Sequence, residues 1–286
     1  MKIALGTAQF GMDYGISNLN GQTSFDEARK IIEFSRNIGI KKIETAKNYG
    51  ETEKIIGEVG IKDFEIITKL PKISSKEIDP TFFVDNQIKD SLKKMKISKI
   101  DTLLLHNPKD LLSTNGKKIF DSILALKREG VINKFGISIY EKNEIEQLNR
   151  NFNFDVIQIP FNIFDTRLTV SGYLKEIKKK GVEIHARSIF LQGLLLMKKN
   201  TLPLKFFRWD KVWNEWFDWF KQNPDISQMK LCLSFALSIQ EIDKIVIGVN
   251  NVKQLEELNE IIKKPLKDNF PIFNVDKKSL LNPTNW

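Results

Sequence analysis

The feature that most constrains the fold is a regular alternation of short apolar segments with longer segments of helical pattern. Short apolar runs bounded by polar or glycine-rich stretches are typical of buried strands. Eight such runs occur, at residues 1–7, 40–43, 64–68, 100–105, 135–138, 156–159, 182–187 and 245–247. No internal repeat and no linker interrupts the alternation. It therefore predicts one α/β domain over residues 1–286, a (β/α)8 TIM barrel.

The segments between these runs carry helix signals. Thr23 or Ser24 can cap a helix that extends through residue 37, and Glu27 would complete a capping box. Further helices are predicted at residues 52–59, 80–96, 119–129, 143–149, 168–180, 231–239 and 252–262. Residues 9–22 are rich in glycine and asparagine and are predicted to form a loop.

The longest insert between predicted elements, residues 188–225, contains four of the five tryptophans. They are Trp209, Trp213, Trp216 and Trp219, at intervals of four, three and three residues. This spacing places side chains on one face of a helix, so it predicts packing in a core.

Composition excludes several classes of protein. The net charge is +9 and the pI about 9.3, but the lysines are scattered, so we expect solvated faces and no nucleic-acid binding. The single cysteine, Cys232, lies in an apolar helical pattern and provides neither an internal disulfide nor a metal cluster. The N-terminal segment lacks a signal-peptide pattern, and no run is long enough to span a membrane. We expect a cytoplasmic protein without a membrane partner, either a monomer or a weak homo-oligomer.

Four polar residues follow three successive predicted strands. Glu44 and Tyr49 follow the second strand, Lys69 the third and His106 the fourth. In α/β barrels the carboxyl ends of the strands carry the active site. Each residue alone has an ordinary structural interpretation, as a surface or strand-end residue. Their occurrence together, at consecutive strand ends, indicates a catalytic group.

These residue types suit the reduction of a carbonyl compound. The reaction needs a hydride donor, which a nicotinamide cofactor supplies because no side chain can, and a proton donor. Tyr49 could supply the proton, but its ordinary pKa is about 10. A nearby Lys69 ammonium would lower that pKa, and Glu44 would hold Lys69 by ion pairing. His106 would bind the carbonyl oxygen or relay the proton.

The chain resembles the aldo-keto reductase superfamily along nearly its whole length. LGTAQFG at 5–11 is similar to the family's first strand and loop, and ETAKNYG at 44–50 to its Asp-Thr-Ala…Tyr-Gly motif. ITKL and LLLH would carry the family's lysine and histidine at Lys69 and His106. The resemblance implies an NAD(P)-dependent oxidoreductase with Tyr49 as general acid and base. Such an enzyme would interconvert an aldehyde or ketone, sugars being one candidate class, and the matching alcohol.

The same resemblance implies the cofactor-binding residues. FGIS at 135–138 and Gln158 would contact the nicotinamide amide, although Ile139 replaces the family's asparagine. RSIFLQGLLL at 187–196 would lie along the pyrophosphate, and IGVNNVKQLEEL at 247–258 would form the adenosine-phosphate loop and its helix. The implied residues are Gly6, Thr7, Ser138, Gln158, Ser188, Gln192, Gly193, Leu194, Gly248, Asn250, Gln254 and Glu257.

Two departures from the family pattern bear on function. Glu44 stands where the family usually has aspartate, one methylene shorter, which could weaken or shift the pairing with Lys69. Gln254 stands where many members carry the arginine that pairs with the 2′-phosphate, and Leu258 replaces an asparagine that often contacts adenine. The usual cofactor of the family favours NADP(H). Because the arginine that would bind the 2′-phosphate is absent, NAD(H) remains an alternative cofactor.

Two alternatives remain open on the sequence alone. The first is a non-catalytic cofactor-binding barrel that acts as a regulatory subunit or sensor. Under this alternative, Glu44 in place of aspartate would mean that the catalytic tetrad, the set of Glu44, Tyr49, Lys69 and His106, is damaged. The second is an unrelated barrel such as a phosphate-binding isomerase or lyase, for which Gly193 and Gly248 are too sparse to form a phosphate loop. The polar 9–22 loop and the basic chain suggest a sugar or an anionic substrate.

Overall fold

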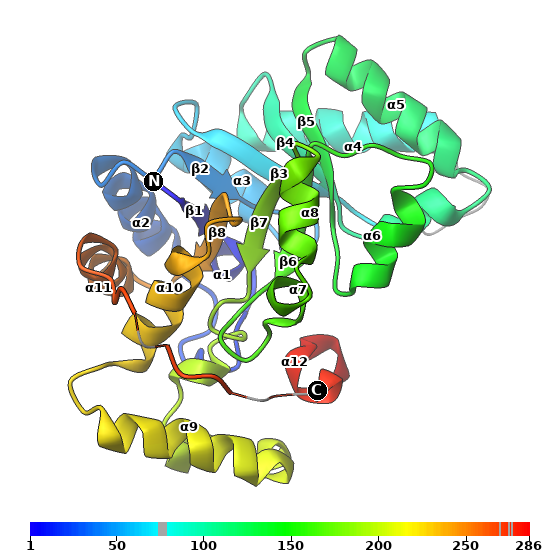
Figure 1. The fold of residues 1–286 in the computed structure, drawn as a ribbon. Coiled ribbons are helices and arrows are strands. Elements are labelled where there is room, and N and C mark those ends of the chain that lie inside the picture. The colour runs from blue at the N-terminus through cyan, green and yellow to red at the C-terminus, as the bar shows by residue number, and fades with distance from the viewer. Residues whose placement is uncertain (74–78, 269, 274, 276) are drawn as a thin grey trace.

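The computed structural model describes residues 1–73, 79–268, 270–273, 275 and 277–286, and it confirms the predicted (β/α)8 barrel (Figure 1). Eight parallel strands close in chain order, with β1 paired to both β2 and β8. The strands are β1 (Ile3–Gly6), β2 (Lys42–Glu44), β3 (Glu65–Leu70), β4 (Ile100–Leu105), β5 (Ile132–Ser138), β6 (Val156–Pro160), β7 (Glu183–Arg187) and β8 (Lys244–Gly248).

Helices surround the strands and continue the alternation. The α-helices are α1 (Ala8–Gly11), α2 (Phe25–Asn37), α3 (Thr52–Val59), α4 (Pro80–Met95), α5 (Gly116–Arg128), α6 (Lys142–Leu148), α7 (Arg167–Val170), α8 (Tyr173–Lys179), α9 (Asp210–Gln222), α10 (Gln228–Ser238), α11 (Val252–Lys263) and α12 (Lys278–Leu281). Short 3₁₀ helices span Pro108–Leu112, Leu194–Leu196, Lys199–Thr201, Leu204–Trp209 and Pro283–Asn285. Within the described ranges, none of the helices is both long and apolar enough to cross a lipid bilayer.

Several predicted boundaries were wrong; the helices predicted to begin at residues 119 and 231, for example, begin at Gly116 and Gln228. β2 starts at Lys42 rather than residue 40, because Ile40 N donates to Ser35 O and closes the preceding turn. β5 starts three residues earlier than predicted, at Ile132. The helix predicted at 168–180 is divided into α7 and α8 by Gly172, whose positive φ of 72° no α-helix accepts.

Two local predictions for the N-terminal part also need correction. The predicted 9–22 loop begins inside the short helix α1. Ser24 does cap α2, since its side chain accepts from Glu27 N. The Glu27 carboxylate does not close a capping box; it accepts from Val252 N at 2.8 Å, at the start of α11. A contact from 225 residues away has replaced the local one, and it ties α2 to α11.

Side chains alternate between two environments along the strands. One set, represented by Ile66, Leu103 and Ile157, belongs to the large core shared with the surrounding helices. The other set points into the barrel, where Ile67, Leu104 and Val156 form a small separate apolar cluster. This two-residue period is the one expected of pleated strands.

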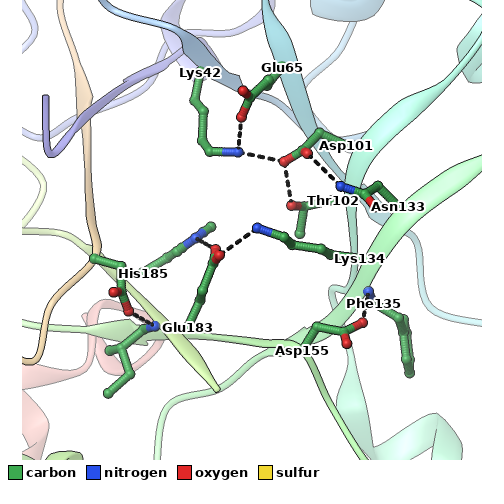
Figure 2. Close-up of polar contacts among 12 residues, drawn as sticks. Lys42, Glu65, Asp101, Thr102, Asn133, Lys134, Phe135, Asp155, Glu183 and His185 are labelled. Carbon is green, nitrogen blue, oxygen red and sulfur yellow. Dashed lines mark hydrogen bonds and ion pairs between the residues drawn. The ribbon is translucent and has the colours of Figure 1, made fainter. Parts of the chain in front are cut away.

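The amino end of the barrel is closed by a cluster of charged side chains, which we call the floor: Lys42, Asp101, Lys134, Glu183 and His185 (Figure 2). Lys42 Nζ lies 2.6 Å from Asp101 Oδ2 and also pairs with Glu65. Lys134 pairs with Glu183, whose other oxygen lies 3.4 Å from His185 Nε2. The floor satisfies its charges internally, on the face of a barrel where stability rather than chemistry is usually placed.

The tryptophans of the insert lie in a second hydrophobic core, as predicted for Trp209, Trp213 and Trp216, while Trp219 is only partly buried. Phe164, from the loop after β6, contacts the rings of Trp213 and Trp216 at centroid distances of 5.8 and 5.1 Å. The segment after β7 and the C-terminal part of the chain add Leu191, Leu194, Leu195, Phe273 and Leu280. Figure 1 shows α9 and α12 on the same side of the barrel, beyond its strands.

Candidate active site

A cleft opens at the carboxyl end of the strands. It contains about 970 Å³ of space, counting open solvent at its mouth. The loop after β1, the ends of β2 and β7, the segment after β7 and the β8–α11 connection form its walls. Among the predicted residues, those that line it are Gly6, Glu44, Tyr49, Ser188, Gln192, Gly193, Gly248, Asn250 and Gln254.

The structure brings Glu44, Tyr49 and Lys69 into direct contact. Lys69 Nζ donates to Tyr49 Oη at 3.1 Å and to the Thr45 carbonyl at 3.1 Å, and it forms an ion pair with Glu44. The lysine is 1% exposed, so the pair is screened little by water. Glu44 thus reaches Lys69 despite its extra methylene.

The turn that presents Tyr49 is fixed by close backbone packing. Thr7 donates to the Glu44 carbonyl through both its backbone N, at 3.0 Å, and its hydroxyl, at 2.9 Å. Gly50, directly after Tyr49, has a φ of 58°, and a Cβ there would lie 2.2 Å from Gly11 O. Only glycine permits both the conformation and the approach. The Tyr49 loop is therefore held against α1.

Glu44 also connects the Lys69 pair to the residues expected at the nicotinamide. Gln158 Nε2 donates to Glu44 Oε1 at 3.2 Å, and Gln158 Oε1 accepts from Ser138 Oγ at 3.1 Å. A continuous chain of hydrogen bonds therefore runs from Ser138 on β5 through Gln158 on β6 to Tyr49. Lys69, Gln158 and Ser138 are all buried below the cleft surface.

The expected direction of the Tyr49 pKa was wrong. Burial raises the pKa of Tyr49 well above its ordinary value, the Glu44 carboxylate raises it further, and the Arg187 charge opposes the rise. Burial lowers the pKa of Lys69, and Glu44 opposes that fall. Tyr49 is consequently held in its protonated form. The phenol is therefore available as a hydrogen-bond donor, and the raised pKa makes it a weaker acid than a free tyrosine until negative charge develops beside it.

His106 stands beside Tyr49 as a neutral imidazole. Their ring centroids are 6.2 Å apart in an edge-on arrangement. Burial, with the Lys69 and Arg187 charges adding to it, lowers the pKa of His106 to about 3. Its Nδ1 is buried and has no hydrogen-bond partner in the described part of the chain. A neutral imidazole can donate a hydrogen bond to a carbonyl oxygen but holds no extra proton to transfer.

Besides the buried Ser138 and Gln158, three residues implied by the resemblance lie away from the cleft surface. Thr7 is fully buried and occupied with the Glu44 carbonyl. Leu194 is fully buried in the second core. Glu257 is exposed on α11.

The cleft fits a dinucleotide on two observations. Leu191, Gln192 and Gly193 are consecutive residues with positive φ, 48°, 54° and 89°, and Ser188 has 62°. The amides of Leu191 and Gly193 donate within the segment, to Ser188 O and Phe190 O, and the three non-glycine residues with positive φ store backbone strain of the kind found at ligand sites. Gln9 Oε1 and Asn250 Oδ1 are buried acceptors left without a partner among the described residues. Both side chains belong to the cleft, where a ligand's hydroxyl or amino groups would satisfy them.

Several lining residues escaped the sequence prediction. Arg187, the last residue of β7, and Tyr14, in the predicted 9–22 loop, both face the cleft with Tyr49. Burial raises the pKa of Tyr14 to about 12, and Tyr49 adds to the rise. The sequence could have indicated Arg187, since it lies at the carboxyl end of a strand, as Lys69 does. Nothing local marks Tyr14, because long-range packing alone brings its loop to the site.

Comparison with known proteins identifies the family. The family model described as "Aldo/keto reductase family" matches residues 2–271. The chain belongs to the aldo/keto reductase family. It is an NAD(P)-dependent oxidoreductase that acts between carbonyl compounds and alcohols. Membership excludes the unrelated phosphate-binding barrel.

Relatives of this aldo/keto reductase are distant. An uncharacterized oxidoreductase of Bacillus subtilis (strain 168), YqkF, is 24% identical over 278 residues, which covers 90% of this chain and 89% of that protein. D-threo-aldose 1-dehydrogenase from a Pseudomonas species is 22% identical over 301 residues, with 89% of each covered. The holo form of aldo-keto reductase AKR11C1 from Bacillus halodurans has a TM-score of 0.73 at 21% identity, covering 93% of this chain and 88% of that one. At this identity the likeness of structures concerns the fold.

Proposed function

We propose that Tyr49 is the general acid with which this enzyme reduces the carbonyl group of a small sugar-like or polyol-derived substrate. The observation that carries the proposal is the 3.1 Å hydrogen bond from the buried Lys69 ammonium to Tyr49 Oη, at the wall of the cleft. A bound nicotinamide cofactor supplies the hydride. The protein's own task is to position the carbonyl and deliver a proton to its oxygen.

The charged groups around Tyr49 are compatible with its donating a proton to a carbonyl oxygen during reduction. Burial and Glu44 keep the phenol protonated until a carbonyl oxygen gains negative charge beside it. When the proton leaves, the phenolate is stabilised by the Lys69 ammonium already hydrogen-bonded to it. His106, neutral and adjacent, donates a hydrogen bond to the same oxygen. Glu44 fixes Lys69 and takes no part in proton transfer.

The proposed cofactor site extends along the cleft away from Tyr49. Ser138 and Gln158 would hold the nicotinamide amide, and the 188–193 segment the pyrophosphate. Gln254 is committed to its own loop: its Oε1 accepts from Asn250 N at 2.8 Å, and its backbone N donates to Asn251 Oδ1, the cap of α11, at 3.0 Å. It offers no cation to a 2′-phosphate. We therefore expect NADP(H) to be favoured only modestly and NAD(H) to be used as well.

Glu44 gives no support to a non-catalytic barrel. That alternative depended on Glu44 as damage to the tetrad, and the Glu44–Lys69 pair is made. The substrate class rests on the polar 9–22 loop, which supplies Tyr14, Ser17 and Asn18 to the cleft. Two similar proteins are named for polyhydroxy compounds, the D-threo-aldose 1-dehydrogenase and the glycerol dehydrogenase AKR11B4 from Gluconobacter oxydans.

A titration followed by a substrate panel tests the proposal. NADPH and NADH should each quench tryptophan fluorescence saturably, one molecule per chain by calorimetry, with NADPH bound a little more tightly. Aldoses and hydroxyaldehydes should then be reduced with higher kcat/KM than alkyl aldehydes of equal size. Failure of both cofactors to bind at millimolar concentration would overturn the cofactor assignment. Preference for the alkyl aldehydes would overturn the substrate class.

A further inference from the structure

Arg187 is a fixed cation at the reacting end of the cleft. It ends β7 two residues after His185, so it continues the inward-pointing set of that strand and lies at the opposite end of the barrel from the floor. Its Nη2 donates to the Ile139 carbonyl at 3.0 Å, and its Nη1 lies 3.4 Å from Ser188 Oγ. The guanidinium carbon lies 4.3 Å from the centroid of the Tyr140 ring. These contacts hold the head group in one orientation without using all of its five donors.

No carboxylate within the described ranges neutralises this cation. Glu44 is the one acidic side chain among the residues that line the cleft, and it is committed to Lys69 and Gln158. The Lys69–Glu44 pair is neutral as a unit, so Arg187 leaves one net positive charge beside Tyr49. That charge acts on four neighbours: it lowers the pKa values of Tyr14, Tyr49, Lys69 and His106.

A half-buried arginine without an anionic partner at a binding cleft is a place for a ligand's anion. Arginine recognises planar or tetrahedral anions through paired N–H groups, and such charge-assisted bonds are about twice as strong as neutral ones. The cofactor phosphates are expected farther along the cleft, at the strained 188–193 segment and at Asn250. A group that reaches Arg187 beside Tyr49 and His106 is therefore most simply part of the carbonyl substrate.

We propose that Arg187 is a specificity-determining residue that binds an anionic group, a carboxylate or a phosphate, on the carbonyl substrate. This rests on the proposed function in one respect, that the ligand at this end of the cleft is the substrate. The preferred substrates are then carbonyl compounds that also carry an acid group, such as oxidised or phosphorylated sugar derivatives. A neutral aldose of the same size lacks the partner that Arg187 needs.

Matched pairs of substrates test the proposal. Reduction of 4-carboxybenzaldehyde is compared with that of its neutral isostere 4-carbamoylbenzaldehyde, and glyceraldehyde 3-phosphate with glyceraldehyde. The wild-type enzyme should show at least one acid-to-neutral ratio of kcat/KM of roughly tenfold to a hundredfold, mostly through KM. The pair with the larger ratio distinguishes carboxylate from phosphate. Ratios near one for both pairs would overturn the proposal.

Two substitutions assign the preference to Arg187. Arg187→Gln should bring the ratio close to one, and Arg187→Lys should retain part of it because the charge remains without the fork. Arg128→Gln, which removes an exposed arginine at the end of α5, is the control for net charge and should keep the wild-type ratio. An unchanged ratio in Arg187→Gln, or an equal loss in Arg128→Gln, would contradict the proposal.

A binding measurement separates this inference from the catalytic one. Calorimetry with benzoate and benzamide requires no turnover, so it reports on the anion site alone. If benzoate binds in a manner that depends on Arg187 but the protein reduces no aldehyde, the anion site is supported and the catalytic assignment is overturned. If the protein reduces aldehydes but binds benzoate and benzamide equally well, the catalytic assignment is supported and the anion site is overturned.

Discussion

The two ends of this barrel differ in how completely their charged side chains are paired with opposite charges. At the floor, Lys42 pairs with Asp101, and Lys134 pairs with Glu183, which also contacts His185 Nε2; of these groups only His185 Nδ1 lacks a partner among the described residues. At the cleft, Lys69 and Glu44 pair, but Arg187 has no acidic partner in the described chain, and the acceptors of Gln9 and Asn250 are left over. A closed set of charges has nothing to offer a ligand. We expect the chemistry at the end where a cation is left without an acidic partner.

The only two histidines of the chain make the same contrast. Burial lowers the pKa of both, so both are neutral at ordinary pH. His185 is fully buried and keeps Glu183 as a neighbour on its own strand. His106 instead packs its ring edge-on against Tyr49, and the Nδ1 atoms of both histidines lack a partner in the described part of the chain. The four predictions that follow test this division, in order of decreasing expected effect.

The largest effect should come from Tyr49→Phe. This change keeps the ring and removes the proposed proton donor, so turnover should fall by roughly 10²–10⁴. Cofactor binding by fluorescence and the midpoint of thermal unfolding should stay near wild type. Tyr173→Phe removes a hydroxyl from a core tyrosine on α8 and serves as the control. Near-full activity in Tyr49→Phe would mean that the proton comes from another group.

Lys42→Met should produce the converse result at the floor. It leaves Asp101 without its buried partner, and breaking such a pair typically costs about 3–5 kcal/mol. Urea unfolding should show that loss, while the folded variant keeps its kcat. Lys117→Met breaks an exposed pair with Asp121 and should cost far less. A large fall in kcat at wild-type stability would place the floor within the catalytic machinery.

The effect of substitutions at Glu44 on kcat should depend on the charge of the new side chain rather than on its length. Glu44→Gln removes the charge that pairs with the buried Lys69, and we expect kcat to fall about tenfold to a hundredfold. Glu44→Asp keeps the charge, restores the family's usual residue and should be mild. The pH profile of kcat should shift in Glu44→Gln, since Glu44 raises the Tyr49 pKa. Equal losses in the two variants would show that chain length, through the Gln158 contact, is what matters.

The smallest effect concerns acid stability. The folded-state pKa of His106, about 3, lies below its unfolded value near 6.5, so its contribution is fully present above pH 6.5 and is lost progressively as pH falls toward 3. For His106 this amounts to about 1 kcal/mol between pH 7 and 5.5. His106→Gln should flatten the fall of unfolding free energy over that range. A slope identical to wild type would show that His106 is not held neutral by burial.

The sequence could predict the barrel and the proximity of Glu44, Tyr49, Lys69 and His106, because both follow from local order. Each βα unit delivers one strand end, so Glu44, Lys69 and His106 had to meet at one edge once the alternation was recognised. The direction of the Tyr49 pKa could not be predicted. It depends on burial by the loop that carries Tyr14 and on the Arg187 charge, both distant along the chain. The Glu27–Val252 bond escaped prediction for the same reason: a strong local signal was overridden by a partner on α11.

The second core has a consequence for the order in which the protein becomes functional during synthesis. Leu191, Leu194 and Leu195 pack with Phe273 and Leu280, about eighty residues later in the chain. The strained segment proposed to hold the pyrophosphate is therefore supported by residues translated well after β8. A nascent chain can therefore complete all eight strands before this one segment of the cleft wall has its packing partners. We expect cofactor affinity to depend on the docking of the segment that contains Phe273 and Leu280.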